Sequence, residues 1–485
     1  KPKSVPSLRY FESVFKVKDV LLEGEKDSVT QLFLVGSTLD VSESLQNSLA
    51  VEVFPLDDSL NEVDFFMNVQ SHINLLDKSI PHILTIVMGK LNYKDYGYIS
   101  GLLKTCHLEH SHIRGKLLVL EDIGLSSLPL IDDIISKELY SIDDEVHYRE
   151  GTRFIKGYDV IDTSVSFSDS SMLKDDGVYL ITGGTGGLGS LVCEFLNAVP
   201  TRRIILIGRS SIEDVSSSLL SHDSVSYYSC DIGTLDSVSF LEERLRSDYG
   251  RLDGVFHCAG VTRDNLLVKK SKEEVEAVFS SKISGVQHLD KLGTIFDMDF
   301  MVLFSSVSSI FGNIGQSDYA SANTYLDQYC YAHNDKEEDD FKIISINWPL
   351  WDTGGMEVDS ETKRYAEKHW GMYPMPAKDG IKSLSSALKG GPDQLLVTYG
   401  EQDKIDKRVL SQSSISKPKV VLDIDKDLLL EKVIPSIHEL ACEVLGFEKG
   451  KVSISEDLSD YGFDSILMTR FSNELNDYYD IDVLP

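Results

Sequence analysis

The stretch from Phe300 to Tyr331 holds the side chains with the clearest potential for chemistry. Its apolar first residues predict a buried strand, Ser306 follows at the carboxyl end of that strand, and Tyr319 opens a helical pattern after a glycine-containing loop. Tyr319 and Asn323 are four residues apart, so they share one helix face. Because ligands of open α/β sheets bind at the carboxyl ends of the strands, this stretch predicts acid chemistry on a carbonyl. A turn-forming serine and a tyrosine that only packs are the alternative interpretation.

A glycine-rich turn upstream predicts a nucleotide site. The apolar strand 178–181 runs directly into TGGTGGLG at residues 182–189, and a helical pattern follows. The spacing fits G-x-G-x-x-G in the strand–turn–helix context that lets a pyrophosphate approach the backbone. We therefore expect cofactor contacts along this turn, at Gly184, Thr185, Gly186, Gly187, Leu188 and Gly189.

Further strands follow at the spacing of a doubly wound sheet, and the residues after them are candidates for the rest of the nucleotide site. The second strand, 203–208, ends in Arg209 and Ser210. A base at this position suits the 2′-phosphate of NADP, whereas an acid suits the ribose of NAD. The loops after the later strands would hold the adenine and let the cofactor lie close to the chain, at Asp231, Ile232, Cys258, Ala259, Gly260, Pro349 and Leu350.

The composition limits the class of protein. The 485 residues suggest two to four domains, and 42% hydrophobic with 26% charged residues is typical of a globular protein. The formal charge of −31 disfavours nucleic acid and anionic membranes as partners. No apolar run is long enough for a membrane span, the N-terminus lacks a signal-peptide core, and the scattered cysteines favour reduced thiols, so we expect a cytoplasmic location. One cluster, Cys106, His107, His110 and His112, lacks a second ligand set, so we expect no metal.

Residues 1–172 give a weaker α/β pattern. Apolar runs at 32–35, 83–87 and 117–120 predict buried strands with helical spacing between them. The turn after the first run begins at Gly36 but lacks the second and third glycines of a pyrophosphate loop. This part of the chain is therefore expected to be structural.

Four motifs carry a resemblance that covers most of the chain. TGGTGGLG, HCAG, FSSVSSIFGNIGQSDYASAN and INWPLW occur in an order and spacing that resemble the ketoreductase domain of a modular polyketide synthase, a member of the short-chain dehydrogenase/reductase superfamily. In such domains a serine lies 13 residues and a lysine 37 residues before the catalytic tyrosine, and an asparagine lies four after it. Measured from Tyr319, these offsets fall on Ser306, Lys282 and Asn323.

The resemblance implies a role for each of these residues. Tyr319 would give its proton to a carbonyl oxygen while NADPH delivers hydride to the carbon. Lys282 would lower the pKa of Tyr319 and bond the nicotinamide ribose. Ser306 would hold the carbonyl oxygen, whereas Asn323 would orient a water or the helix backbone rather than touch the substrate.

The same resemblance predicts the product's stereochemistry. An Asp in the loop after the fourth strand marks the ketoreductases that give a D-configured β-hydroxyl, and a Trp eight residues before the tyrosine marks the opposite type. The loop here contains Asp264, and the position eight before Tyr319 is Phe311. We therefore expect the D-alcohol, with a plain loop aspartate as the alternative.

The C-terminal part resembles an acyl carrier protein. The polar, proline-containing stretch after the last strand predicts a linker, and a helical pattern follows it up to Gly446. DLSDYGFDSI at 457–466 resembles a phosphopantetheine attachment signature with Ser465 as the modified hydroxyl, although Asp464 and Ser465 could simply cap a helix. The chain stops after the second long helix of such a carrier, so we expect this region to be poorly ordered in isolation.

Together these patterns predict an α/β fold of two packed Rossmann-like subdomains, one degenerate and one NADP-binding, followed by a partial α-helical carrier bundle. The expected divisions are a structural subdomain at 1–172, a catalytic subdomain at 173–408, a linker at 409–424 and a truncated carrier at 425–485. The resemblance implies reduction of a carrier-tethered β-ketoacyl thioester, with neighbouring polyketide synthase domains as partners and NADPH and phosphopantetheine as cofactors. A silent scaffold module and a free-standing NADPH reductase of small ketones are the alternatives.

Overall fold

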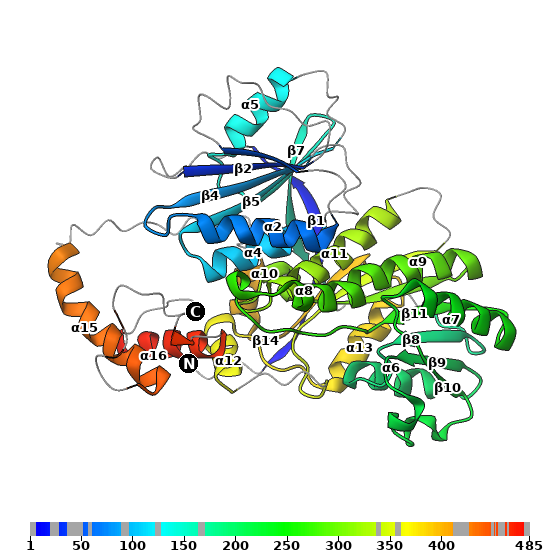
Figure 1. The fold of residues 1–485 in the computed structure, drawn as a ribbon. Helices are drawn as coiled ribbons and strands as arrows, with labels where there is room; N and C mark the ends of the chain where they lie inside the picture. The colour runs from blue at the N-terminus through cyan, green and yellow to red at the C-terminus, as the bar shows by residue number, and fades with distance from the viewer. Residues whose placement is uncertain are drawn as a thin grey trace.

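The computed structural model describes residues 6–19, 29–35, 52–56, 61–88, 97–121, 128–162, 170–335, 341–354, 360–410, 426–447, 451, 453, 461–462 and 465–479. Within them, one 14-stranded sheet runs through both halves of the α/β body (Figure 1). None of the helices in these ranges is long and apolar enough to cross a membrane.

The C-terminal half of the sheet is a parallel, doubly wound unit. It consists of β8 Val178–Thr182, β9 Arg203–Gly208, β10 Val225–Ser229, β11 Gly254–His257, β12 Phe300–Ser306, β13 Lys342–Trp348 and β14 Gln394–Gly400. These strands pair in parallel in the order β10-β9-β8-β11-β12-β13-β14. Their near-continuous apolar runs are buried on both faces, as parallel sheets require. The strand order reverses between β8 and β11, which places a ligand crevice at their carboxyl ends.

The N-terminal half continues the same sheet. It consists of β1 Ser7–Val17, β2 Val29–Val35, β3 Glu52–Leu56, β4 His82–Met88, β5 Ile113–Leu120, β6 Glu145–Arg149 and β7 Thr152–Val160. The order from β14 onward is β1-β7-β6-β5-β4-β2-β3. β1 is antiparallel to both neighbours, and Phe11 pairs with Leu396 on one side and Val160 on the other. β1 therefore joins the N-terminal half of the sheet to β14 of the C-terminal half.

Helices cover both faces of the sheet. They are α2 Glu62–Leu75, α4 Ile99–Glu109, α5 Leu128–Glu138, α6 Gly187–Asn197, α7 Leu235–Asp248, α8 Lys272–Phe279, α9 Gly285–Phe296, α10 Ser308–Phe311, α11 Ser317–Asn334, α12 Ser360–Tyr365, α13 Ala377–Ala387 and α14 Gln402–Leu410. A π-helical turn, Ser280–Ser284, links α8 to α9. Figure 1 shows α4, α8, α10 and α11 gathered where the two subdomains meet.

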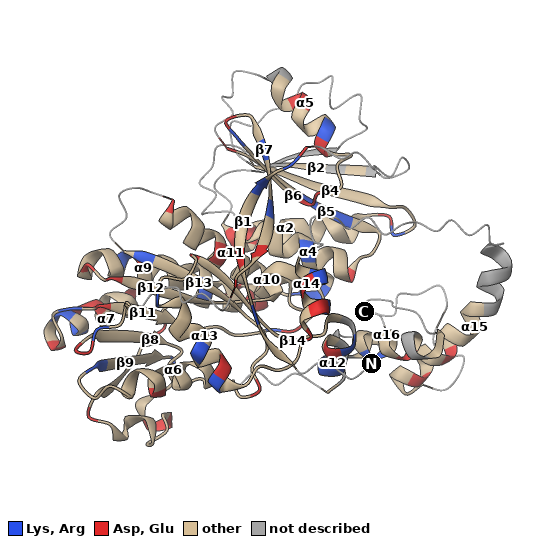
Figure 2. Cartoon of the chain, turned by 180° about the vertical axis from the view of Figure 1, so that it is seen from behind, with Lys and Arg blue, Asp and Glu red and all other residues tan. Residues whose placement is uncertain are grey.

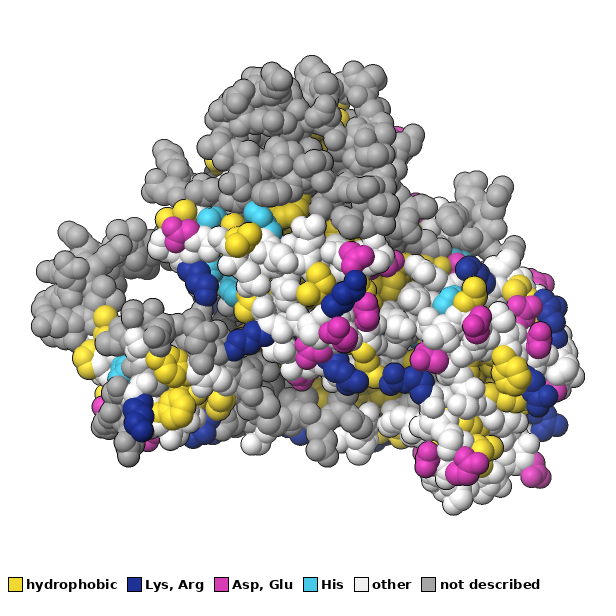
Figure 3. Space-filling view, in the orientation of Figure 1, with side chains coloured by type: hydrophobic (Ala, Val, Ile, Leu, Met, Phe, Trp, Pro, Cys, Tyr) yellow, Lys and Arg dark blue, Asp and Glu magenta, His cyan; other side chains and the backbone are white. Residues whose placement is uncertain are grey.

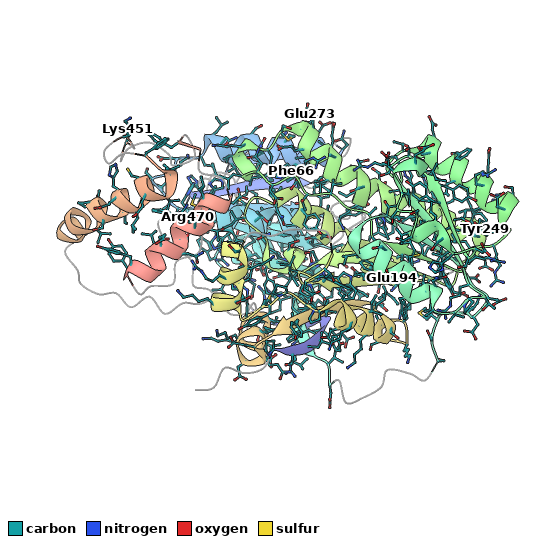
Figure 4. The ribbon with its side chains drawn as sticks, turned by 90° about the horizontal axis from the view of Figure 1, so that it is seen from below. Phe66, Glu194, Tyr249, Glu273, Lys451 and Arg470 are labelled. Carbon is teal, nitrogen blue, oxygen red and sulfur yellow. The ribbon has the colours of Figure 1, made fainter. Side chains whose placement is uncertain are left out.

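The contact between the two subdomains is an apolar core. Phe66 of α2 packs edge-on against Phe279 of α8, with ring centroids 5.9 Å apart. Figure 4 shows Phe66 and Glu273 on these two neighbouring helices. Buried side chains of both subdomains, such as Leu102 and Tyr325, belong to the same hydrophobic cluster. Apolar side chains of the two halves therefore pack directly against each other.

The C-terminal region adds α15 Lys426–Leu445 and α16 Ser465–Tyr479. Buried Leu440, Ala441 and Val444 pack against Phe471, and Gly446, at φ 70°, ends α15 where the sequence predicted a stop. α14 extends through Leu410, so the first two residues of the predicted linker are helical, and residues 411–424 lie outside the described residues. Poor order of the isolated carrier stays a prediction.

Charged side chains are distributed over both subdomains (Figure 2). On the described part of the face in Figure 3, acidic and basic side chains are interspersed. The net acidity of the whole chain therefore does not collect into one patch on this face.

Candidate active site

Tyr319, Lys282 and Ser306 meet at one cavity. Tyr319 stands in the first turn of α11, Ser306 ends β12, and Lys282 projects from the π-helical turn before α9. The Lys282 ammonium donates to the carbonyl oxygen of Phe304 at 2.9 Å and lies 5.5 Å from the centroid of the Tyr319 ring. All three side chains line a cavity of about 220 Å³ at the carboxyl edge of the parallel strands. The structure thus brings together the three residues that the family offsets selected.

The cavity wall is mainly apolar and aromatic with a few polar groups. Cys258, Gly260, Pro349 and Leu350 contribute from the loops after β11 and β13, and Leu188 contributes from α6. The lining also includes residues that were not predicted individually from the sequence, namely Asn313, Gln316, Lys363, Trp370, Met372 and Tyr373. Such a wall with convergent polar groups is typical of a small-molecule site.

Burial controls the protonation of the two central groups. It raises the pKa of Tyr319 to about 12, and a side-chain hydrogen bond with Asn323 opposes this shift. Burial also lowers the pKa of Lys282 to about 8. The pKa of Tyr319 is therefore raised on balance, because desolvation of the phenolate is the largest effect, and a lowering contribution from Lys282 stays a prediction. The phenol is left protonated at neutral pH, which is the form that a proton donor needs.

Because the pKa of Lys282 is lowered in the folded state, the free energy of unfolding is expected to depend on pH. Between about pH 8 and the ordinary value of 10.5, the unfolded chain keeps a proton that the folded state has released, so stability rises with pH through this window. We expect the free energy of unfolding of the wild type, relative to that of Lys282→Met, to increase by roughly 3 kcal/mol across it. Urea unfolding of both proteins at the two ends of the window measures this difference. A difference that stays constant with pH would show that Lys282 titrates normally.

Asn323 and Ser306 make contacts that orient the backbone around the cavity. Asn323 is fully buried and donates to the backbone carbonyl of Tyr319 at 2.8 Å. It does not line the cavity, in keeping with the expectation that it acts on the helix backbone or a water. The hydroxyl of Ser306 accepts from the backbone N–H of Ser308 at 3.1 Å, so a hydrogen remains for an oxygen in the cavity.

The glycine-rich turn has the geometry of a pyrophosphate loop. Gly183 adopts a left-handed φ of 62°, and a side chain at Gly189 would clash with the carbonyl oxygen of Gly183. Gly186 caps the N-terminus of α6, so the backbone N–H groups of the turn face outward from a helix end. The left-handed residue of the turn thus lies one position before Gly184, the first glycine of the G-x-G-x-x-G match. The unbroken TGGTGGLG run contained that signal.

The other predicted cofactor residues lie at the same edge of the sheet. Arg209 and Ser210 are exposed just after β9. Asp231 accepts from the N–H of Gly233 at 3.0 Å. The backbone N–H of Ala259 donates to the hydroxyl of Thr182 at 3.0 Å, and Ile232 and Cys258 follow β10 and β11. A Cβ at Gly260 would come within 2.9 Å of Lys282 Cε, so a larger residue there would have to displace the end of the lysine side chain. These residues fit an extended dinucleotide across the crevice.

The two predicted stereocontrol residues occupy different positions. Phe311 lines the cavity and lies under the Arg408 guanidinium, 4.7 Å from its ring centroid. Asp264 is exposed outside the cavity lining and accepts a hydrogen bond from Gln316 at 3.0 Å. Asp264 is thus linked to the cavity through Gln316, and its charge helps to raise the pKa of Tyr319; its role in stereocontrol stays a prediction.

Two further predicted sites are the carrier serine and the histidine cluster at the end of α4. Ser465 is the first residue of α16, and Asp464 lies outside the described residues. Within the described ranges, no three His, Cys, Asp or Glu side chains gather as metal ligands would. In the histidine cluster, Cys106 is buried in α4 and His107 bonds the carbonyl oxygen of Ile113.

A doubly wound parallel sheet with a tyrosine, lysine and serine at its crevice defines a reductase of the short-chain dehydrogenase/reductase type. Comparison with known families agrees with this class. The family described as KR domain matches residues 177–353, and the family described as phosphopantetheine attachment site matches residues 435–484. Residues 177–353 therefore belong to the ketoreductase domain family and residues 435–484 to the carrier family, as the sequence motifs predicted.

Individual relatives support the same family. Polyketide synthase PksN of Bacillus subtilis is 32% identical over 442 residues, which cover 87% of this chain and 8% of the synthase. Polyketide synthase PksL of the same organism is 32% identical over 402 residues, 78% of this chain and 9% of that one. A solved ketoreductase domain from the bacillaene assembly line superimposes with a TM-score of 0.72 at 28% identity, covering 84% of this chain and all of that domain. The chain thus spans less than a tenth of these synthases.

Proposed function

We propose that this chain reduces a carrier-tethered β-ketoacyl thioester to the β-hydroxyacyl thioester with NADPH as the hydride donor. The observation that carries the proposal is the convergence of buried Tyr319 and Lys282 with Ser306 on a single cavity. That cavity shares Leu188, Cys258 and Gly260 with the nucleotide crevice. A ketone in it would therefore lie between the proton donor and the reducing cofactor.

Each group at the cavity has a different role in the reduction. The nicotinamide, when bound, supplies hydride to the carbonyl carbon. Ser306 donates a hydrogen bond to the carbonyl oxygen, which fixes its position and stabilises the charge that develops on it. Tyr319, neutral at physiological pH, passes its proton to the same oxygen. Lys282, held by the carbonyl of Phe304, then stabilises the phenolate until a proton returns from solvent.

The exposed base after β9 supports a preference for NADPH. Arg209 is exposed directly after β9, a position at which a base suits the 2′-phosphate of NADP, and Ser210 after it is not an acid. We expect Arg209→Ala to raise the KM for NADPH about tenfold and to change the KM for NADH by less than about twofold. Steady-state kinetics with both nucleotides measure this ratio. Equal effects on both would place the 2′-phosphate away from Arg209.

The attached carrier segment supports a tethered substrate. Ser465 opens α16, and the N-terminus of a helix favours the phosphodiester of a phosphopantetheine arm. We infer that the acyl chain is presented on such an arm and that neighbouring domains of a longer synthase supply and receive it. The matches to much longer polyketide synthases support this inference.

The function is tested by NADPH oxidation with a β-ketoacyl thioester of N-acetylcysteamine, followed by separation of the product enantiomers. Turnover with NADPH, slower turnover with NADH and formation of the D-alcohol are expected. If NADPH binds and no ketone is reduced, the chain is a silent scaffold module. If the L-alcohol forms, Asp264 does not mark the stereochemical type.

A further inference from the structure

Glu109, the last residue of α4 in the structural subdomain, reaches into the catalytic subdomain. One of its carboxylate oxygens accepts from the backbone N–H of Leu267 at 2.6 Å, and the other accepts from that of Gly315 at 2.9 Å. Leu267 belongs to the loop that carries Asp264, and Gly315 belongs to the loop that leads into Tyr319. A single carboxylate therefore bridges the two loops that flank the cavity.

The two bridged loops also bond each other. The N–H of Asn265 donates to the carbonyl of Gly315 at 2.9 Å, and the side chain of Gln316 donates to Asp264 at 3.0 Å. Gln316 lines the cavity. The position of this cavity residue is thus fixed by the same small network in which Glu109 takes part.

A buried ion pair extends the network to the catalytic tyrosine. Lys270 and Asp318, both with fully buried side chains, lie 2.8 Å apart. The same oxygen of Asp318 accepts from the backbone N–H of Tyr319 at 2.8 Å, and Lys270 also donates to the carbonyl of Arg263. The loop that Glu109 holds is therefore connected directly to the first turn of α11.

The structural subdomain holds this loop at a second point. Gln70 of α2 is buried and donates to the carbonyls of Leu267 and Lys270, at 2.6 and 2.8 Å. α4 itself packs tightly on α11, because a Cβ at Gly101 would lie 2.5 Å from the carbonyl of Ala320. The subdomain that lacks a nucleotide loop thus contacts the backbone on both sides of Tyr319.

We propose that Glu109 is a positioning residue for ketone reduction, whose carboxylate clamps the Asp264 loop to the loop before Tyr319 and thereby fixes the pose in which the ketone meets its proton donor. The inference rests on the proposed function and adds a specificity role for the structural subdomain. Glu109 does not touch the cavity, so its effect is transmitted through Gln316 and the first turn of α11.

Glu109→Gln tests this clamp with a side chain of the same shape. The amide keeps one acceptor but turns a donor toward the second backbone N–H, so one of the two bridges is lost. We expect kcat to fall about tenfold and the share of the minor alcohol enantiomer to rise about fivefold, because small misplacements at a reacting centre are costly. Partial unfolding would lower kcat, but it would leave the enantiomer ratio of the remaining folded enzyme unchanged.

Glu121→Gln is the matched control. Glu121 lies in the same subdomain and pairs with Arg149 and His147, at 3.0 and 3.2 Å, without contacting either loop. The same chemical change there is expected to leave kcat and the enantiomer ratio within about twofold of the wild type.

Hydrogen exchange followed by mass spectrometry gives a readout that needs no turnover. In Glu109→Gln, peptides that cover 261–271 and 312–318 are expected to exchange at least about tenfold faster than in the wild type, while the rest of the chain is unchanged. Unchanged exchange in both peptides would overturn the clamp. Faster exchange with an unchanged enantiomer ratio and kcat would overturn the positioning role. Absence of turnover in the wild type would count against the proposed function instead. Hydrogen exchange alone would then show whether Glu109 holds the two loops together.

Discussion

Tyr319→Phe is expected to lower the rate of ketone reduction about a thousandfold, because it removes the phenolic proton and leaves the ring in place. The ring is almost completely buried, so Phe fills the same space and the cavity keeps its shape. Lys282 keeps its bond to the carbonyl of Phe304, which does not involve Tyr319. Nucleotide affinity is therefore expected to stay within about twofold of the wild type.

The measurement is single-turnover reduction of the thioester mimic, with nucleotide affinity from fluorescence titration. Tyr325→Phe is the matched control, because Tyr325 lies on the same helix, is fully buried and accepts from Gln287 at 2.7 Å outside the cavity. It makes the same chemical change and should keep most of the activity. If Tyr319→Phe retained more than about a tenth of the wild-type rate, another group would have to be the acid.

The sequence predicted those parts of the site that follow from local pattern. Three elements are each encoded within about 20 residues: the strand that ends at Ser306, the helix that carries Tyr319 and the glycine turn. The hydrophobic periodicity and the turn-forming residues are therefore enough to identify them. Lys282 was selected by its distance of 37 residues from Tyr319, which is a property of the family. The local sequence alone would predict a lysine on the exposed face of a helix. The structure instead places it in a π-helical turn with 2% of its surface exposed.

Contacts between distant segments could not be predicted. Ser7 pairs with Gly400 at the join between the subdomains, and Glu109 reaches Gly315; neither pair has a local signature. The pKa of Tyr319 is raised by burial. That burial depends on the whole fold, so the shift could not be predicted from the sequence. The part of the site that sequence misses is therefore the part supplied by packing.

A buried carboxylate beneath the active site shows how far this packing contributes to stability. Asp327 of α11 accepts from the hydroxyls of Ser309 and Ser345, both at 2.6 Å, and from the amide of Asn347 at 2.7 Å. Asn347 in turn donates to the hydroxyl of Ser305 at 3.1 Å. The network thus ties α10 and α11 to β12 and β13 directly below Ser306.

Asp327→Ala should therefore destabilise the protein strongly. The substitution removes the charged acceptor that three buried donors share and opens a cavity among them, so the free energy of unfolding is expected to fall by about 3 to 5 kcal/mol. Asp327→Asn keeps the shape and one acceptor, and its loss should be roughly half as large. Asp133→Ala, which breaks an exposed pair with Lys137, should change stability by less than about 0.5 kcal/mol.

Urea unfolding of the three variants, followed by tryptophan fluorescence, orders these effects. Asp327→Ala is expected to cost more than Asp133→Ala because of desolvation. Water can replace the lost carboxylate at the exposed Asp133, but it cannot enter the packed site around Asp327. If Asp327→Ala and Asp133→Ala lost similar amounts, water would have to reach the donors around Asp327. The polar residues below Ser306 would then be a hydrated channel, and the rigidity of the catalytic edge would have to come from the apolar contacts of α11 alone.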